Sequence, residues 1–166
     1  EMLNEISRHT DVKLRVDANE AWKDLESFIR FHDSLKGKNI ELIEQPFPSI
    51  MTEEYKELKK MSKYVLLADE SIEDVGNFSS LSEQFHAINI KLMKTGSLIK
   101  AKKLIEEARS YKMQVMIGYM IESSIGISYG MHFTGLADYV DLDGHLLIKD
   151  EPYNLVTESS GLLNLK

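Results

Sequence analysis

The chain has 166 residues, of which 43% are hydrophobic and 28% charged, and its formal net charge is −7. This composition supplies one globular core and does not indicate disorder. The acidic balance argues against nucleic acid as a partner, because a phosphate backbone needs clustered Lys and Arg.

The sequence also indicates a cellular compartment. It contains no cysteine, which excludes disulfides and thiolate chemistry and suits a reducing cytosol. No apolar run approaches the ~20 residues of a membrane span, and the opening residues show no signal-peptide pattern. We therefore expect a cytoplasmic protein without a membrane partner.

The first predicted element is a helix. In "EMLNEISRH" the side chains of Met2, Leu3 and Ile6 share one face at helical spacing. The chain opens on Glu1 inside this pattern, with no cap before it. We therefore expect a fragment of a longer protein.

Six short apolar runs rich in Val and Ile follow, and they predict buried strands. In chain order they are "VKLRV" (12–16), "IELI" (40–43), "YVLLA" (64–68), "AINI" (87–90), "QVMI" (114–117) and "YVDL" (139–142). Helical stripes separate most of them, with Thr52 and Ser97 as expected N-caps. These stripes are Trp22, Leu25, Phe28, Ile29 and Leu35; Tyr55, Leu58 and Met61; and Leu98, Ala101, Leu104, Ile105 and Ala108, with a weaker helix over 77–84.

The alternation of strand and helix predicts right-handed βαβ units and a parallel sheet. Such a sheet is either open and doubly wound or closed as a (β/α) barrel, and the length per unit is that of a barrel. The segment "VDANEAW" after the first strand lacks G-x-G-x-x-G, which disfavours nucleotide binding.

Charged side chains stand where the predicted strands end, which is where parallel α/β folds place their chemistry. In strand order they are Asp17, Glu44, Asp69, Lys91, Glu122 and the pair Asp141 and Asp143.

Three acids at three successive strand ends predict a metal site. Asp17, Glu44 and Asp69 would repel one another at close range unless a cation neutralised them. Hard carboxylate oxygens, with no Cys or His beside them, favour Mg²⁺, or Mn²⁺ as a substitute. An acid at a single strand end, taken alone, is usually a helix cap or a turn residue.

Lys91 is the candidate catalytic base. Alternation with Asn89 would point it into a barrel, and a partly desolvated lysine beside a cation has a lowered pKa and can accept a proton near neutral pH. The alternative is a salt-bridged lysine with no catalytic role.

The motifs "VDANEAW", "IEQPFP", "LLADES", "INIKLMKTGS", "GYMIESSIGI" and "DLDGHLLIKDEP" resemble the enolase superfamily. The resemblance is to its muconate-lactonizing-enzyme subgroup, and within that subgroup to dipeptide epimerases of the L-Ala-D/L-Glu type. It implies a modified (β/α)₇β barrel of the TIM type, of which about six βα units are present. Residues 1–166 would then be the C-terminal part of the catalytic barrel, without the capping domain and the first barrel strands.

The resemblance also implies roles for the strand-end residues. Asp17, Glu44 and Asp69 would be the Mg²⁺ ligands and Lys91 the catalytic base. The implied reaction removes and returns the α-proton next to a carboxylate through a metal-stabilised enediolate. The implied substrate contacts are Asp141 and Asp143, which would hold the free ammonium of a dipeptide, with Glu122 and Asn19.

Two departures from the family pattern affect these expectations. In the family, a K-x-K motif on the strand before "VKLRVDAN" carries a second acid/base lysine. We expect this chain to lack that lysine and therefore to be inactive alone. His145 also stands where the family usually has Pro, a change that could tune which dipeptide fits or be neutral.

Two alternative functions stay open. One is a muconate-type cycloisomerase or o-succinylbenzoate synthase, which shares every named residue except the role of the D-x-D pair. The other is a non-catalytic partial barrel that self-associates through exposed strand edges, so we expect a homo-oligomer.

Overall fold

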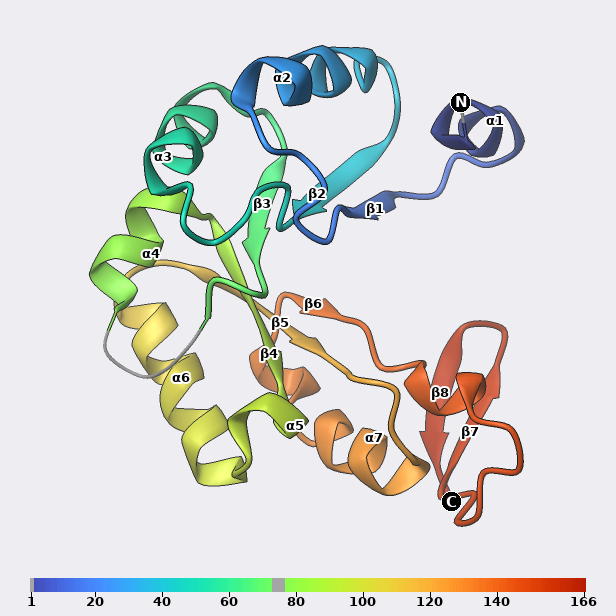
Figure 1. Cartoon of the computed structure of the whole chain (residues 1–166). Helices are drawn as coiled ribbons and strands as arrows, with labels where there is room; N and C mark the ends of the chain where they lie inside the picture. The colour runs from blue at the N-terminus through green and yellow to red at the C-terminus, as the bar shows by residue number, and fades with distance from the viewer. Residues whose placement is uncertain (1, 73–76) are drawn as a thin grey trace. The chain divides into compact units, whose positions relative to one another are not determined.

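The computed structural model describes residues 2–72 and 77–166. The chain forms two compact units, Glu1–Ala87 and Ile88–Lys166. Figure 1 labels the helices and strands of each.

The first unit alternates helices with parallel strands. Its elements are α1 (Met2–His9), β1 (Leu14–Asp17), α2 (Leu25–Ser34), β2 (Ile40–Glu44), α3 (Thr52–Met61), β3 (Val65–Ala68) and α4 (Phe78–Gln84). The strands β1, β2 and β3 are neighbours in that order, and both pairs are parallel. This is the βαβ arrangement that the sequence predicts.

The second unit continues the pattern and ends in a hairpin. Its elements are β4 (Ala87–Lys91, which begins one residue before the boundary), α5 (Leu92–Thr95), α6 (Leu98–Ser110), β5 (Gln114–Gly118), α7 (Ser124–Met131), η1 (Thr134–Leu136), β6 (Tyr139–Val140), η2 (Gly144–Leu147), β7 (Val156–Ser159) and β8 (Leu162–Leu165). The strands β5 and β6 are parallel, whereas β7 and β8 form a separate antiparallel pair.

A chain of aromatic contacts forms the core of the first unit. The ring of Phe47, in the loop after β2, lies 5.2 Å from Phe28 of α2 and 5.3 Å from Tyr55 of α3, and Tyr55 lies 4.4 Å from Phe85. All four side chains are fully buried. Edge-to-face packing of this kind fixes the position of the loop that follows Glu44.

Helix capping agrees with the sequence at one site and differs at another. Ser97 caps α6 as predicted, because its side chain accepts from the backbone N–H of Lys100. The prediction for Thr52 is wrong: Thr52 is the first residue of α3, and the N-cap position is held by Met51, which makes no side-chain cap bond. A capping side chain has to stand outside the first turn to reach its N–H groups, so Thr52 cannot serve.

Several element boundaries also differ from the predictions by one or two residues. β1 begins at Leu14, and β6 ends at Val140, two residues earlier than expected. Trp22 precedes α2, whose N-cap is Asp24, and packs against Phe28 and Phe31. Among the described residues, no helix is both long and apolar enough to cross a bilayer.

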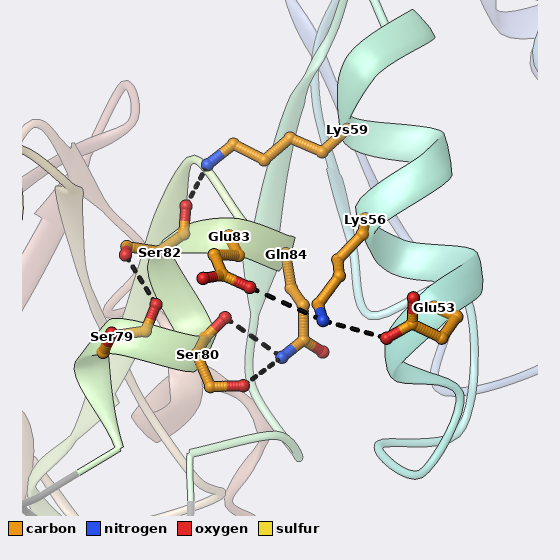
Figure 2. A network of polar contacts seen from close by, with 8 residues as sticks. All are labelled: Glu53, Lys56, Lys59, Ser79, Ser80, Ser82, Glu83 and Gln84. Carbon is orange, nitrogen blue, oxygen red and sulfur yellow. Dashed lines mark hydrogen bonds and ion pairs between the residues drawn. The ribbon is translucent and has the colours of Figure 1, made fainter.

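The ammonium of Lys59 joins α3 to the end of α4 (Figure 2). It donates to the backbone carbonyls of Ser82 and Phe85, the latter at 2.7 Å. Removing the charge with Lys59→Met keeps the apolar stem but leaves two helix-end carbonyls without this donor. We expect the free energy of unfolding to fall by about 1–3 kcal/mol, as measured by urea denaturation. The exposed neighbour provides the control Lys60→Met, and equal midpoints for both variants would refute the role of Lys59.

The lowered pKa values of two histidines in the first unit predict that the protein loses stability in acid. Desolvation lowers the pKa of His32 and of His86, with the Lys59 charge adding to the effect at His86 and the Asp33 charge opposing it at His32. The Nδ1 atom of His86 accepts from the backbone N–H of Leu66 at 3.0 Å, and protonation would break this bond.

Both histidines have folded-state pKa values below the ordinary value of about 6.5. In acid, the unfolded chain therefore binds more protons than the folded chain does. Stability is therefore complete above pH ~6.5 and falls as the pH drops toward the folded-state pKa values. Thermal melts between pH 8 and 5 measure this slope. His86→Gln should flatten it, whereas the exposed His9→Gln should not; a slope that neither variant changes contradicts the assignment to His86.

Candidate active site

The ends of β1, β2 and β3 bring the three predicted acids to adjacent positions. The Cα atoms of Asp17 and Glu44 are register partners, and Glu44 is in turn the partner of Leu67, two residues before Asp69. Parallel register partners point to the same face of a sheet. Glu44 and Asp69 are each only 5% exposed, and Asp17 is exposed.

The side chains of these acids do not surround one point in this structure. Within residues 2–72 and 77–166, no three His, Asp or Glu side chains are arranged so that they could hold a metal ion. Asp17 also accepts from the backbone N–H of Asn19 at 3.0 Å, which is the contact of a turn residue. The carboxylate oxygens of the three acids and the positions of their backbones suit a hard cation. The three side chains would have to move towards one another to bind it.

Main-chain bonds tie together the loops that follow these strands. The N–H of Ala18 donates to the carbonyl of Glu44 at 3.0 Å, and the N–H of Glu20 to the carbonyl of Gln45 at 2.8 Å. Asn19, Glu20 and Gln45 all have positive φ, at 43°, 56° and 36°. Such backbone is costly for residues other than glycine and concentrates at functional sites.

Lys91 ends β4 on the same face as Asn89, and Lys91 is half-buried. The amide of Asn89, which is 3% exposed, lies directly over Gly118 at the end of β5. A Cβ at Gly118 would stand 2.2 Å from Asn89 Oδ1, so only glycine admits this amide. Sequence reasoning missed Gly118, because a close approach of this kind depends on the pairing of strands.

Asp141 and Asp143 follow β6 and line a cavity of about 550 Å³. Its other walls come from α7, η1, η2 and the β7–β8 hairpin, with Glu158 as a third acid. Burial, together with a hydrogen bond to Asp143 and the charges of both acids, raises the pKa of Tyr119 to about 12. The ring of Tyr119 fills the space where a side chain at Gly144 would start, 2.1 Å from an ideal Cβ. Neither Tyr119 nor Gly144 was predicted from the sequence.

Glu122 lines a different cavity, of about 290 Å³, with mostly apolar neighbours. Desolvation raises its pKa. Its carboxylate lies against Gly126 of α7, where a Cβ would stand 1.9 Å from Oε2. Glu122 is therefore not gathered with Asp141 and Asp143 in the larger cavity.

His145 lies in η2 and is buried, with 6% of its surface exposed. Neither ring nitrogen has a hydrogen-bond partner in the part of the chain that the structure describes. His145 stands where the family usually has Pro. It therefore places a polar ring in a buried position beside the loop of Asp143.

Parallel strands that alternate with helices are the arrangement of an α/β barrel domain. The family model for "Enolase C-terminal domain-like" proteins matches residues 1–156. The chain belongs to this family.

Individual relatives agree with that assignment. The L-Ala-D/L-Glu epimerase of Bacteroides thetaiotaomicron is 36% identical over 165 residues, which cover 99% of this chain and 43% of the relative. The chain thus spans less than half the length of this relative.

Two solved structures show the fold. A substrate-liganded L-Ala-D/L-Glu epimerase from Bacillus subtilis has a TM-score of 0.90 and 28% identity, covering 99% of this chain and 48% of that one. The Enterococcus faecalis V583 dipeptide epimerase, complexed with Mg and L-Leu-L-Tyr, has a TM-score of 0.79 and 32% identity, covering 88% and 42%. The predicted fold class, a partial (β/α) barrel of the TIM type, is confirmed.

Proposed function

We propose that the chain is part of an epimerase that removes and returns the α-proton next to a carboxylate, with a dipeptide of the L-Ala-D/L-Glu type as substrate. The names of the relative from Bacteroides thetaiotaomicron and of the Bacillus subtilis structure support this reaction. The observation that carries the proposal is the placement of Asp17, Glu44 and Asp69 at the ends of three neighbouring parallel strands.

These three carboxylates would hold Mg²⁺, with Mn²⁺ as a substitute. Neighbouring parallel strands lie about 4.8 Å apart, so acids at adjacent strand ends start within reach of a common ion. The Enterococcus faecalis structure, described as complexed with Mg, supports this choice. A bound Mg²⁺ would supply Lewis-acid stabilisation of the negative charge that develops on the substrate carboxylate.

Lys91 would supply the proton chemistry, and four further residues would supply substrate contacts. Lys91 would take the α-proton from one face of the substrate, and a lysine outside this chain would return it on the other. Asp141 and Asp143 would bind the ammonium of the dipeptide, because both carboxylates line one cavity. Glu122 and Asn19 are the other two proposed substrate contacts, although Glu122 lines a cavity separate from that of Asp141 and Asp143.

We also propose that residues 1–166 are the C-terminal part of a longer catalytic barrel and that the isolated chain self-associates. β1 stands first in the strand order, which leaves one edge of the strand open to a further strand. Val12 beside it and Met2 of α1 are 63% and 73% exposed. Sedimentation of the 166-residue chain should give a dimer or larger species, and a monodisperse monomer would refute self-association.

The test of the proposed reaction uses the longer protein that contains this chain. In D₂O with Mg²⁺, it should exchange the α-proton of L-Ala-L-Glu or a related dipeptide and form the D/L mixture, as followed by proton NMR. Chelation of the metal should stop both processes. If no dipeptide in a broad library is epimerised while a cycloisomerase or o-succinylbenzoate substrate is turned over, the dipeptide assignment fails and the alternative stands.

A further inference from the structure

One side chain connects the loops after β2 and β3. The side-chain oxygen of Gln45 accepts from the backbone N–H groups of Asp69 at 2.9 Å and Ser71 at 3.2 Å. Its amide nitrogen, which carries two hydrogens, has three acceptors within hydrogen-bond distance: Ser71 Oγ at 2.7 Å, the Tyr55 hydroxyl at 2.9 Å and the Phe47 carbonyl at 3.2 Å. These partners also fix the orientation of the amide, because the oxygen faces two donors and the nitrogen faces a carbonyl.

The backbone of Gln45 extends the connection to the strands on both sides. Its N–H donates to the carbonyl of Leu67 in β3 at 3.0 Å, and its carbonyl accepts from the N–H of Glu20 after β1 at 2.8 Å. Gln45 thus contacts the segments that follow all three strands bearing the predicted acids. Gln45 is the next residue after Glu44, and its side-chain oxygen accepts from the backbone N–H of Asp69.

The conformation of Gln45 indicates that this connection is not incidental. The residue is fully buried and has a φ of 36°, which an L side chain rarely adopts. Strained backbone persists only where the surroundings determine it, and here the surroundings are the hydrogen bonds just described. The Tyr55 hydroxyl supports the same loop, since it accepts from the N–H of Phe47 at 2.9 Å and donates to the carbonyl of Phe47.

We propose that Gln45 is a positioning residue for the cation site: its buried amide holds the loops of Glu44 and Asp69 in the relative position that lets both carboxylates reach one divalent ion. This inference rests on the proposed function, because it takes Asp17, Glu44 and Asp69 as the cation ligands. Gln45 itself does not touch the ion. Residues that orient metal ligands without binding the metal typically contribute 10- to 100-fold to affinity.

The test compares two volume-conserving variants of buried glutamines in the 166-residue chain. Gln45→Met removes the amide that holds the loops. Gln84→Met removes an amide of similar burial on α4, whose bonds go to the backbone and hydroxyl of Ser80 (Figure 2). Mn²⁺ binding is measured by electron paramagnetic resonance of the free ion, and folding by thermal melting.

Gln45→Met should raise the Mn²⁺ dissociation constant at least about tenfold, while Gln84→Met should leave it within about twofold at a comparable loss of melting temperature. Equal Mn²⁺ affinity in the wild type and a folded Gln45→Met variant would overturn the positioning role and leave the proposed cation site intact. A wild-type chain that binds no Mn²⁺ would instead remove the cation site, and the inference with it.

A second variant covers the case in which Gln45→Met does not fold. Ser71→Ala removes only the hydroxyl that accepts from the Gln45 amide at 2.7 Å. It should weaken Mn²⁺ binding about two- to fivefold, since the loop after β3 keeps its backbone bonds to the Gln45 oxygen. Unchanged affinity in Ser71→Ala would then overturn the inference.

Discussion

Replacing Glu44 by Gln is expected to raise the Mn²⁺ dissociation constant on the order of 100-fold, which is the upper end of what a residue that only orients ligands contributes. Glu44 is on the middle strand, in register with Asp17 and beside the strand that leads to Asp69. The substitution keeps the shape of the side chain and removes its charge. Calorimetric titration of the 166-residue chain measures the change.

A second carboxylate on the same strand separates cation binding from the general effect of losing a negative charge. The control is Glu41→Gln on the opposite face of β2, whose carboxylate is bound by Lys13 at 3.1 Å and Arg15 at 2.8 Å. Glu41→Gln should leave Mn²⁺ affinity unchanged; equal losses in both variants would mean that the effect is general electrostatics.

Replacing Lys91 by Met in the longer protein is expected to lower the rate of epimerisation by about 10²–10⁴-fold, the usual contribution of a general base. Lys91 ends β4 and shares a face with the buried Asn89. Cation affinity should not fall, because the proposed ligands lie on other strands. Lys91 is proposed to act on one face of the substrate only. Proton NMR in D₂O should therefore show that α-proton exchange is lost from one epimer and persists in the other.

Lys94 provides the matched control for Lys91. It lies three residues further on, in α5, and is exposed. Lys94→Met should retain the epimerisation rate within about threefold. Loss of exchange from both epimers in Lys91→Met, or an equal loss in Lys94→Met, would argue against a one-face base at Lys91.

The fold could be predicted from the sequence because its signal is local. Short Val- and Ile-rich runs separated by amphipathic stripes specify parallel strands, and charged residues at strand ends follow from reading where each run stops. Asp17, Glu44, Asp69 and Lys91 were found in this way. Their side-chain positions could not be predicted, because rotamers depend on contacts between segments distant in the sequence.

Gln45 shows why part of the site was missed. In the sequence it is one polar residue between Glu44 and Pro46, and nothing local indicates that it is fully buried with a φ of 36°. Its role depends on partners 10 to 26 residues away. Tyr119 and Gly144 were missed for the same reason, since they meet only when the loops after β5 and β6 are side by side.

The C-terminal hairpin was missed although the sequence contains a signal for it. Ser160 and Gly161 both have positive φ, at 54° and 79°, as tight hairpin turns require. The pair "SG" between "VTES" and "LLNL" is a turn signal. Asn or Asp before the glycine would have made it stronger.

The central claim is that Asp17, Glu44 and Asp69 bind one divalent cation together, and a crystal structure of the chain grown with Mn²⁺ tests it most directly. We expect a single anomalous peak with an oxygen of each of the three carboxylates close to the distance of about 2.1 Å that Mg²⁺ prefers. A Mn²⁺ ion bound to other residues, with these three side chains apart from it, would contradict the account.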